Sequence, residues 1–225
     1  MTDTPTTTIL FVLFPGITQL DFTAPAQALC RLPGAQLVGA AASLDPIATD
    51  SGFSILPTHD FASAPSADIL CVPGGHGVAD ALHDAETIAF IARQAAHARW
   101  ITSVCTGAFL LGRAGLLEGR KATTHWAYTH LLPRVGATHE AARVVEDGNV
   151  VTSGGVTSGL DFALTLIGRL RGPATAQAIQ LAIEYDPAPP YAGGHPDRTP
   201  EAVTEGLKAR VYDAAAARME AALTS

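Results

Sequence analysis

The chain has 225 residues, of which 48% are hydrophobic and 16% are charged, and its formal net charge is −7. A disordered chain would be poorer in apolar residues and richer in charge, so this composition indicates a globular protein. The acidic balance offers no basic face to a phosphate backbone, which argues against nucleic-acid binding. The length suits one α/β domain built around one core.

The N-terminal region and the cysteines bear on the compartment. The first 30 residues contain no Lys or Arg, so the positive region of a secretion signal is missing. The apolar run at 9–14 is too short to cross a bilayer, and a Pro-Gly pair ends it. Three cysteines without a CxxC pair favour reduced thiols over disulfides or a zinc site. We therefore expect a cytoplasmic protein with no membrane contact.

Short apolar runs alternate with helical periodicity along the first half of the chain. The polar, Thr-rich residues 1–8 are expected to form a loose arm. The expected strands are 9–13, 36–42, 52–56, 69–72 and 100–104. The expected helices are 21–32, with Pro25 near its first turn, 84–97 and 109–117. Continuous apolar strands such as 9–13 predict a sheet that is covered on both faces.

The second half of the chain continues the alternation. We expect a short strand at 121–124, a helix at 126–132, and a hairpin at 143–152 because two Val pairs flank Asp147 and Gly148. Helices at 159–171 and 174–185 precede an irregular Pro/Gly-rich stretch at 187–200 and a last amphipathic helix at 201–223. The pattern predicts one α/β domain over 1–225, with a mostly parallel sheet and 187–225 as a C-terminal extension.

The segment 100–111 places Cys105 where an expected strand turns into a helix. Such an elbow raises a side chain above the carboxyl edge of the sheet, where open α/β folds bind ligands. Free N–H groups at a helix start favour a thiolate, with pKa values of roughly 3.5–7.5 in such settings. We interpret Cys105 as a nucleophile. Cys30, in an apolar helical setting, and Cys71, inside a buried strand, are interpreted as structural.

Other candidate groups follow neighbouring strands. Gly75, in the turn after strand 69–72, could offer a backbone N–H as an oxyanion donor, or the turn could simply end the strand. Asp21 follows the first strand and is either a helix N-cap or a functional acid close to the cysteine. His125 is the best-placed of eight histidines to act with the thiol. No pair of histidines has metal-site spacing such as HExxH, so no metal is expected.

Four segments together resemble the DJ-1/PfpI superfamily: 14–25, 72–75, 103–107 and 121–126. The likeness runs to about Pro190, and within the superfamily the chain is most similar to the isonitrile hydratases. The resemblance implies a flavodoxin-like sandwich, a nucleophile elbow at Cys105, an acid beside it at Asp21, and a homodimer. Protease-like members have His after the cysteine, whereas Thr106 stands here, as in the hydratases.

The resemblance also implies a reaction on a small-molecule isonitrile. Cys105 adds to the terminal carbon, Asp21 supplies the proton with help from Thr106, and Asp21 then activates water, so that a thioimidate becomes an N-substituted formamide. Thr106 could act by its hydroxyl or its backbone, or only cap a helix. Gly75 would be a second donor, and His125 would orient the site or serve a structural hydrogen bond. No cofactor is required.

Three other interpretations remain open. The same thiol could serve a glyoxalase, deglycase or amidase of this superfamily. Cys105 could instead be a peroxide-sensing thiol in a protein that is not an enzyme, since oxidants select accessible cysteines of low pKa. A ligand-sensing regulator is disfavoured, because the residues after Pro190 offer one helix and no helix-turn-helix.

Overall fold

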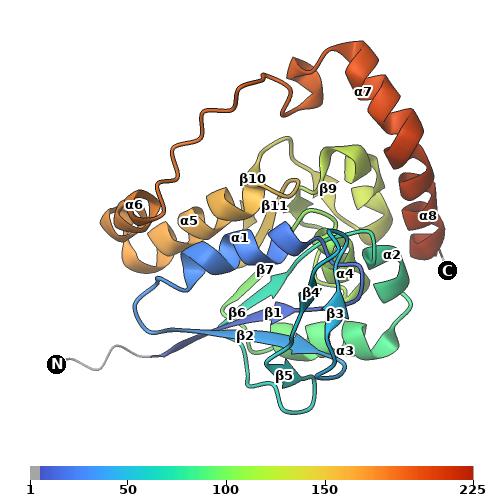
Figure 1. The fold of residues 1–225 in the computed structure, drawn as a ribbon. Coiled ribbons are helices and arrows are strands. Elements are labelled where there is room, and N and C mark those ends of the chain that lie inside the picture. The colour runs from blue at the N-terminus through green and yellow to red at the C-terminus, as the bar shows by residue number, and fades with distance from the viewer. Residues whose placement is uncertain (1–5, 225) are drawn as a thin grey trace.

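A seven-stranded sheet forms the centre of the computed structural model, which describes residues 6–224 (Figure 1). The strand order is β10-β11-β7-β6-β1-β2-β5, and every neighbouring pair is parallel except β10 with β11. The strands are β1 (Thr7–Val12), β2 (Ala35–Ala41), β5 (His59–Asp60), β6 (Ile69–Val72), β7 (Trp100–Val104), β10 (Val144–Asp147) and β11 (Val150–Ser153). The long parallel strands thus follow the 2-1-3-4-5 order of flavodoxin-like folds, which confirms the predicted fold class.

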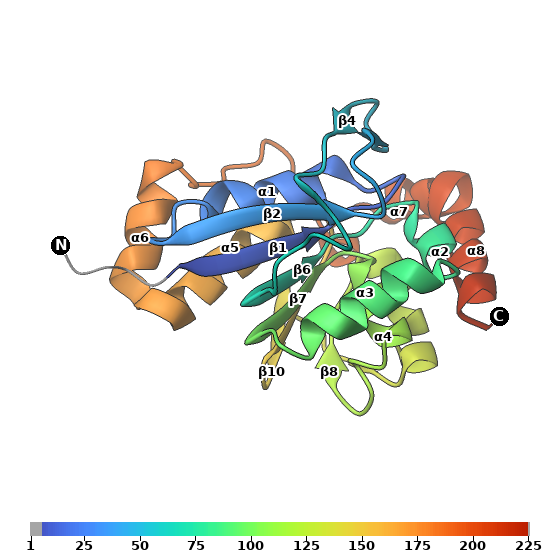
Figure 2. The ribbon, with the colours of Figure 1, turned by 90° about the horizontal axis from the view of Figure 1, so that it is seen from below.

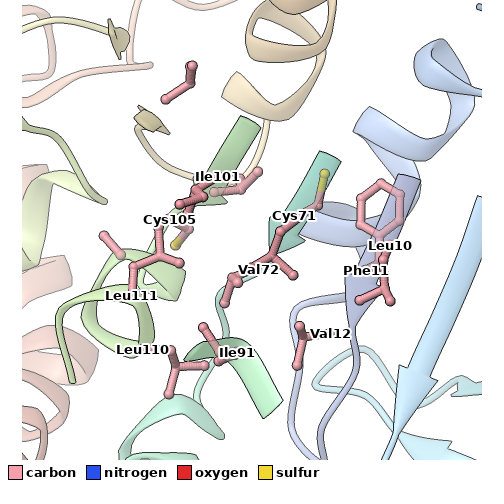
Figure 3. Packing of buried hydrophobic residues seen from close by; sticks show 14 of the residues in the cluster. Leu10, Phe11, Val12, Cys71, Val72, Ile91, Ile101, Cys105, Leu110 and Leu111 are labelled. Carbon is pink, nitrogen blue, oxygen red and sulfur yellow. The ribbon is translucent and has the colours of Figure 1, made fainter. Parts of the chain in front are cut away.

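Helices cover both faces of this sheet (Figure 2). On one face α1 (Gln19–Leu29) packs against α5 (Ser158–Arg171), which also carries α6 (Pro173–Ala182). On the other face α3 (Ala85–Ala95) packs against α4 (Gly107–Arg113), next to the short helix α2 (Val78–Ala81). The strands are apolar on both sides because both sides are buried: Leu10, Phe11 and Val12 of β1 lie beside Cys71 and Val72 of β6 (Figure 3).

Two short strand pairs and two 3-10 helices lie outside the central sheet. The strands β3 (Ile47–Ala48) and β4 (Ser54–Ile55) form an antiparallel pair, and β8 (Lys121–Ala122) pairs in parallel with β9 (Thr138–His139). The 3-10 helix η1 spans Trp126–Val135, and a single 3-10 turn η2 spans Pro196–Arg198. The predicted hairpin at 143–152 is confirmed as β10 and β11.

The C-terminal segment runs back over the carboxyl end of the sheet. Helix α7 (Glu201–Leu207) continues through a π-helical turn, η3 (Lys208–Tyr212), into α8 (Asp213–Thr224). Helix α8 contacts η1 and α2, with Arg134 bound to Glu220 at 2.6 Å and Arg218 bound to Asp80. The single helix expected at 201–223 is therefore present in extent but contains a π turn. No helix within residues 6–224 is long and apolar enough to span a membrane.

Three sequence predictions about elements need correction. The expected arm at 1–8 is too long, because Thr7 and Thr8 already pair with β2; residues 1–5 lie outside the described part. Helix α1 begins at Gln19 rather than Asp21, since Thr18 is its N-cap, so Pro25 lies inside the helix. Cys30 is the exposed C-cap of α1, which overturns its apolar, structural interpretation.

Candidate active site

Three chain segments meet where β1, β6 and β7 end. Parallel strands bring their carboxyl ends to one edge of the sheet, and the strand order reverses between β1 and β6, which is where such folds bind ligands. The loop after β1 is tied to the turn after β6: Thr18 N–H donates to the Gly74 carbonyl at 2.9 Å, and Gly77 N–H donates to the Gly16 carbonyl at 3.0 Å. These bonds fix the start of α1, and thus the position of Asp21.

Cys105 lies on a strained elbow between β7 and α4. Its φ of 57° is in the left-handed region, which a non-glycine residue adopts only when its surroundings enforce it. The surroundings do so: its N–H donates to the carbonyls of Ser153 and Gly154 at 3.1 and 2.9 Å, and its carbonyl accepts from the Thr124 hydroxyl at 2.7 Å. The predicted sharp turn from strand to helix at Cys105 is present, and Thr124 helps to hold it.

The glycine at 74 lets the acid and the elbow approach each other. A Cβ on Gly74 would lie 2.6 Å from Thr106 N, 2.7 Å from Thr106 Oγ1 and 2.9 Å from Asp21 Oδ2. Contacts this short do not occur, so any side chain here would push Asp21 and Thr106 apart. The Gly-Gly turn therefore serves close packing of the site.

Asp21 is fully buried and lies against the thiol. Its Oδ2 accepts from Gly74 N–H at 3.0 Å, whereas Oδ1 has no N–H or O–H partner within residues 6–224. Burial raises the pKa of Asp21 to about 7, and the charge of Asp50 adds to the rise, while the hydrogen bonds from Gly74 and Cys105 oppose it. Because Thr18 is the N-cap, Asp21 is free to act as an acid near neutral pH.

The thiol of Cys105 is not the thiolate that the sequence suggested. Burial raises its pKa well above the ordinary value, and the neighbouring Asp21 charge raises it further. The backbone N–H groups of Thr106 and Val156 approach the sulfur and oppose this rise. Helix α4 starts just after the thiol, at Gly107 rather than at the predicted residue 109, but its effect on the pKa of Cys105 is smaller than that of burial. The resting site therefore holds a neutral thiol beside a base that can take its proton.

Thr106 and Gly75 are bonded to each other. The Thr106 hydroxyl accepts from Gly75 N–H at 3.0 Å and lies 3.3 Å from the Gly75 carbonyl. The Gly75 N–H is therefore already engaged, so an oxyanion at this turn would have to compete with the Thr106 hydroxyl for it. The Thr106 side chain makes no helix-capping bond, so the capping alternative is wrong.

His125 is buried in an aromatic cluster at the wall of the site. Burial lowers its pKa to about 4, with a further contribution from His76, so the ring is neutral. Its Nδ1 accepts from Ala127 N–H at 3.3 Å, and its Nε2 lies 3.5 Å from the Tyr212 hydroxyl. Since Nδ1 is the acceptor, Nε2 carries the proton. The ring contacts Tyr212 and Tyr128 rather than Asp21 or the thiol, which favours the structural alternative.

A cavity of about 160 Å³ opens onto the thiol. Cys105 is only 6% exposed, yet it is part of this wall. The other lining residues come from seven separate segments: Thr18, Asp50, Gly75, His76, Thr106, His125, Tyr128, Val156 and Tyr212. Of these, sequence reasoning missed Thr18, Asp50, Tyr128, Val156 and Tyr212. The predicted Asp21, Cys105, Thr106, Gly75 and His125 all come together.

Cys71 is buried inside β6, and burial raises its pKa to about 12, in line with its structural interpretation. Among residues 6–224 there is no cluster of three or more His, Cys, Asp or Glu side chains that could hold a metal ion.

Comparison with known families agrees with this geometry. The model of the DJ-1/PfpI family matches residues 7–169, which contain the whole sheet and the Asp21–Cys105 pair. The chain belongs to the DJ-1/PfpI family. The match ends inside α5, so the chain from residue 170 onward, including Tyr212, lies beyond the part matched by the DJ-1/PfpI model.

Relatives of this DJ-1/PfpI protein extend over the C-terminal segment as well. Isonitrile hydratase from Pseudomonas putida is 48% identical over 93% of this chain and 92% of its own length. A THiJ/PfpI family protein from Pseudomonas syringae superposes with a TM-score of 0.94 at 40% identity, covering 97% of this chain and 90% of that one. The HTH-type transcriptional regulator GbdR of Pseudomonas aeruginosa is 34% identical over 60% of this chain, but over only 37% of its own length.

Proposed function

We propose that the protein is an isonitrile hydratase, a hydro-lyase that converts an isonitrile to an N-substituted formamide through a thioimidate on Cys105. The observation that carries the proposal is a buried acid with a pKa near 7 set against a cysteine on a strained elbow, at the wall of a small cavity. The 48% identity to the Pseudomonas putida hydratase supports it.

The first step joins the thiol to the terminal carbon of R–N≡C. Asp21, as the carboxylate, takes the thiol proton while sulfur bonds to that carbon. Asp21 then gives this proton to the same carbon, which yields the neutral thioimidate R–N=CH–S–Cys105. The hydrogen bonds from Thr106 and Val156 stabilise the sulfur as it gains charge. One proton shared by the pair is enough, so a resting thiolate is not needed.

The second step hydrolyses the thioimidate. Asp21 takes a proton from water as the water oxygen bonds to the thioimidate carbon, and passes this proton to the nitrogen. The C–S bond of the resulting tetrahedral intermediate then breaks, the hydroxyl proton returns to the sulfur through Asp21, and R–NH–CHO leaves. Atoms balance as R–NC plus water, and no metal or organic cofactor takes part. Covalent capture divides one difficult hydration into two easier reactions.

The cavity suits a small, uncharged substrate. A dry cavity of about 150 Å³ can hold one benzene molecule, so about 160 Å³ accommodates an isonitrile with a short chain or one small ring as its R group. Asp50 is part of the cavity wall, and its negative charge would repel an anionic substrate.

Cys105→Ala tests the proposal directly. The purified protein should convert cyclohexyl isocyanide to N-cyclohexylformamide, measured by gas chromatography, and Cys105→Ala should lower the rate by about 10³-fold or more. Cys30→Ala, which removes an exposed thiol, should retain full turnover. Turnover by Cys105→Ala at the wild-type rate would end the covalent scheme, and a protein that turns over methylglyoxal but no isonitrile would belong with the glyoxalase alternative.

Two alternatives are disfavoured by specific observations. A peroxide sensor needs a thiolate of low pKa, whereas burial and Asp21 raise the pKa of Cys105. The similarity to a transcriptional regulator covers only 37% of that regulator.

We also propose that the protein is a cytoplasmic homodimer. The free thiols favour a reducing compartment, and the strongly exposed Phe53 and Leu56 near the β3–β4 pair are apolar groups suited to a subunit interface. Sedimentation velocity tests the dimer.

A further inference from the structure

A cavity and a surface groove share Tyr212 as a lining residue. The catalytic cavity of about 160 Å³ and a larger surface groove of about 590 Å³ both include Tyr212 in their walls. The groove lies between η1 and the C-terminal helices, and its lining includes the apolar side chains of Trp126 and Ala216 and the charged side chains of Glu205 and Lys208. The ring of Tyr212 thus forms part of the partition between the site of the chemistry and open space.

An unusual backbone turn positions the ring of Tyr212. Tyr212 ends the π-helical turn η3, and such turns are rare and often mark functional sites. The wider turn adds a residue between α7 and α8, which rotates the side chains that follow relative to a regular helix. As a result Tyr212 faces inward, while its neighbour Val211 is exposed.

Neighbouring aromatic side chains pack against the ring of Tyr212. The Tyr212 ring centroid lies 5.0 Å from those of His125 and Trp126 and 6.1 Å from that of Tyr128. His125 and Tyr128 line the catalytic cavity, and Trp126 lines the groove, so these contacts run along the partition itself. The protonated Nε2 of His125 points its hydrogen to the Tyr212 hydroxyl at 3.5 Å, which is a weak contact. Ring packing, more than this bond, keeps Tyr212 in place.

We propose that Tyr212 determines substrate size: its ring closes the catalytic cavity toward the groove and so sets the upper limit on the R group of the isonitrile. This inference rests on the proposed function and adds to it the residue that selects the substrate. Tyr212 comes from the chain beyond the DJ-1/PfpI match, so size selection is carried by the C-terminal addition rather than by the shared domain.

Truncating the ring should open the two hollows into one. In Tyr212→Ala, kcat/KM for the bulky 1-adamantyl isocyanide should rise relative to kcat/KM for methyl isocyanide by about tenfold or more, the scale of a pocket that gains or loses a few carbon atoms. The small substrate should itself react more slowly, because it loses an apolar wall. Tyr212→Phe keeps the ring and should keep the wild-type ratio.

A matched tyrosine elsewhere serves as the control. Tyr191 is 84% exposed on the same C-terminal part of the chain, so Tyr191→Ala should leave the size ratio unchanged. If Tyr212→Ala melts well below the wild type, Tyr212→Leu provides a partial truncation that keeps an apolar side chain. A size ratio that stays at the wild-type value in both folded truncations would overturn the proposal.

Thiol alkylation separates this test from the hydratase activity. In a Cys30→Ser background, the rate at which Cys105 is alkylated by iodoacetamide and by N-cyclohexylmaleimide can be followed by peptide mass mapping. Tyr212→Ala should accelerate the bulky maleimide selectively. That result would support the size limit even if no isonitrile were hydrated, whereas equal acceleration of both reagents would count against it.

Discussion

The carboxyl edge of the sheet and the C-terminal segment 201–224 contribute to the wall of one cavity in different ways. At the sheet edge, Asp21, Cys105 and Thr106 are all at most 6% exposed, and Gly74 has no room for a methyl group. The C-terminal segment is largely exposed, and it is attached in part by the surface ion pair Arg134–Glu220, a type of contact worth about 0–1 kcal/mol.

This difference assigns separate tasks to the two walls. A proton moving between Asp21 and the sulfur needs fixed distances, which dense packing and a strained elbow supply. An outer wall only has to exclude molecules that are too large, and it can change without disturbing the chemistry. Variants at the sheet edge should therefore alter turnover of every isonitrile by the same factor, while variants of Tyr212 should alter the ratio between substrates.

The largest effect is expected for Asp21→Asn. An amide cannot carry the proton, so kcat/KM should fall by about 10²–10⁴-fold, the usual contribution of a general acid–base. The loss should be equal for methyl and cyclohexyl isocyanide. Asp186→Asn, an exposed substitution of the same kind, should have no effect. A loss confined to isonitriles of one size would contradict the separate roles proposed for the two walls.

The wild-type pH profile follows from the same pair. The active form holds one proton between Asp21 and Cys105, and a second proton binds below about pH 7, where Asp21 becomes neutral. A neutral acid cannot accept the thiol proton, so kcat/KM should decline as the pH falls below 7. The residual activity of Asp21→Asn should lack this decline, and an unchanged profile in that variant would assign the titration to another group.

The free energy of unfolding should also depend on pH through Asp21. Folding raises the pKa of Asp21 from 3.8 to about 7, so this group favours the folded state fully below pH 4 and loses that contribution as the pH rises toward 7. Relative to the wild type, Asp21→Asn should gain stability as the pH rises from 5 to 8, by about 2–3 kcal/mol. Urea unfolding at the two pH values measures this, and a difference that does not vary with pH would contradict the burial argument.

The sequence was sufficient for the central strands of the sheet, although the edge strand β5 was missed and the strand expected at 52–56 pairs outside the sheet. Strands 69–72 and 100–104 were predicted to the residue, because Pro73 and the Cys-Thr-Gly turn mark where the two strands end. Asp21, Gly75 and Cys105 could be grouped for the same reason, since parallel strands end at a common edge. The start of α1 was misjudged because the tie from Thr18 to Gly74 joins residues far apart in the chain.

The pKa of the thiol and the outer wall could not be read from the sequence. A helix start suggested a thiolate, but the degree of burial, which decides the pKa of Cys105, depends on how distant segments such as 153–156 pack against the elbow. Tyr212 lies 107 positions after Cys105, and no local pattern marks the π turn that aims it inward. Composition and periodicity describe single elements, whereas these two features arise from packing between elements.

Among the variants at the sheet edge, Gly74→Ala is expected to have the smallest effect. It tests whether the two walls of the cavity act independently. A methyl group would meet Thr106 and Asp21 at 2.6–2.9 Å, so the acid must move from the sulfur, at a cost of about 1–3 kcal/mol in stability. We expect kcat/KM to fall by about 10–100-fold, since misplaced catalytic groups lose rate steeply. Gly194→Ala, where a methyl group meets open space, is the control. The bulky-to-small substrate ratio should stay at the wild-type value, because Tyr212 is untouched; a change in that ratio would mean that the two walls are coupled after all.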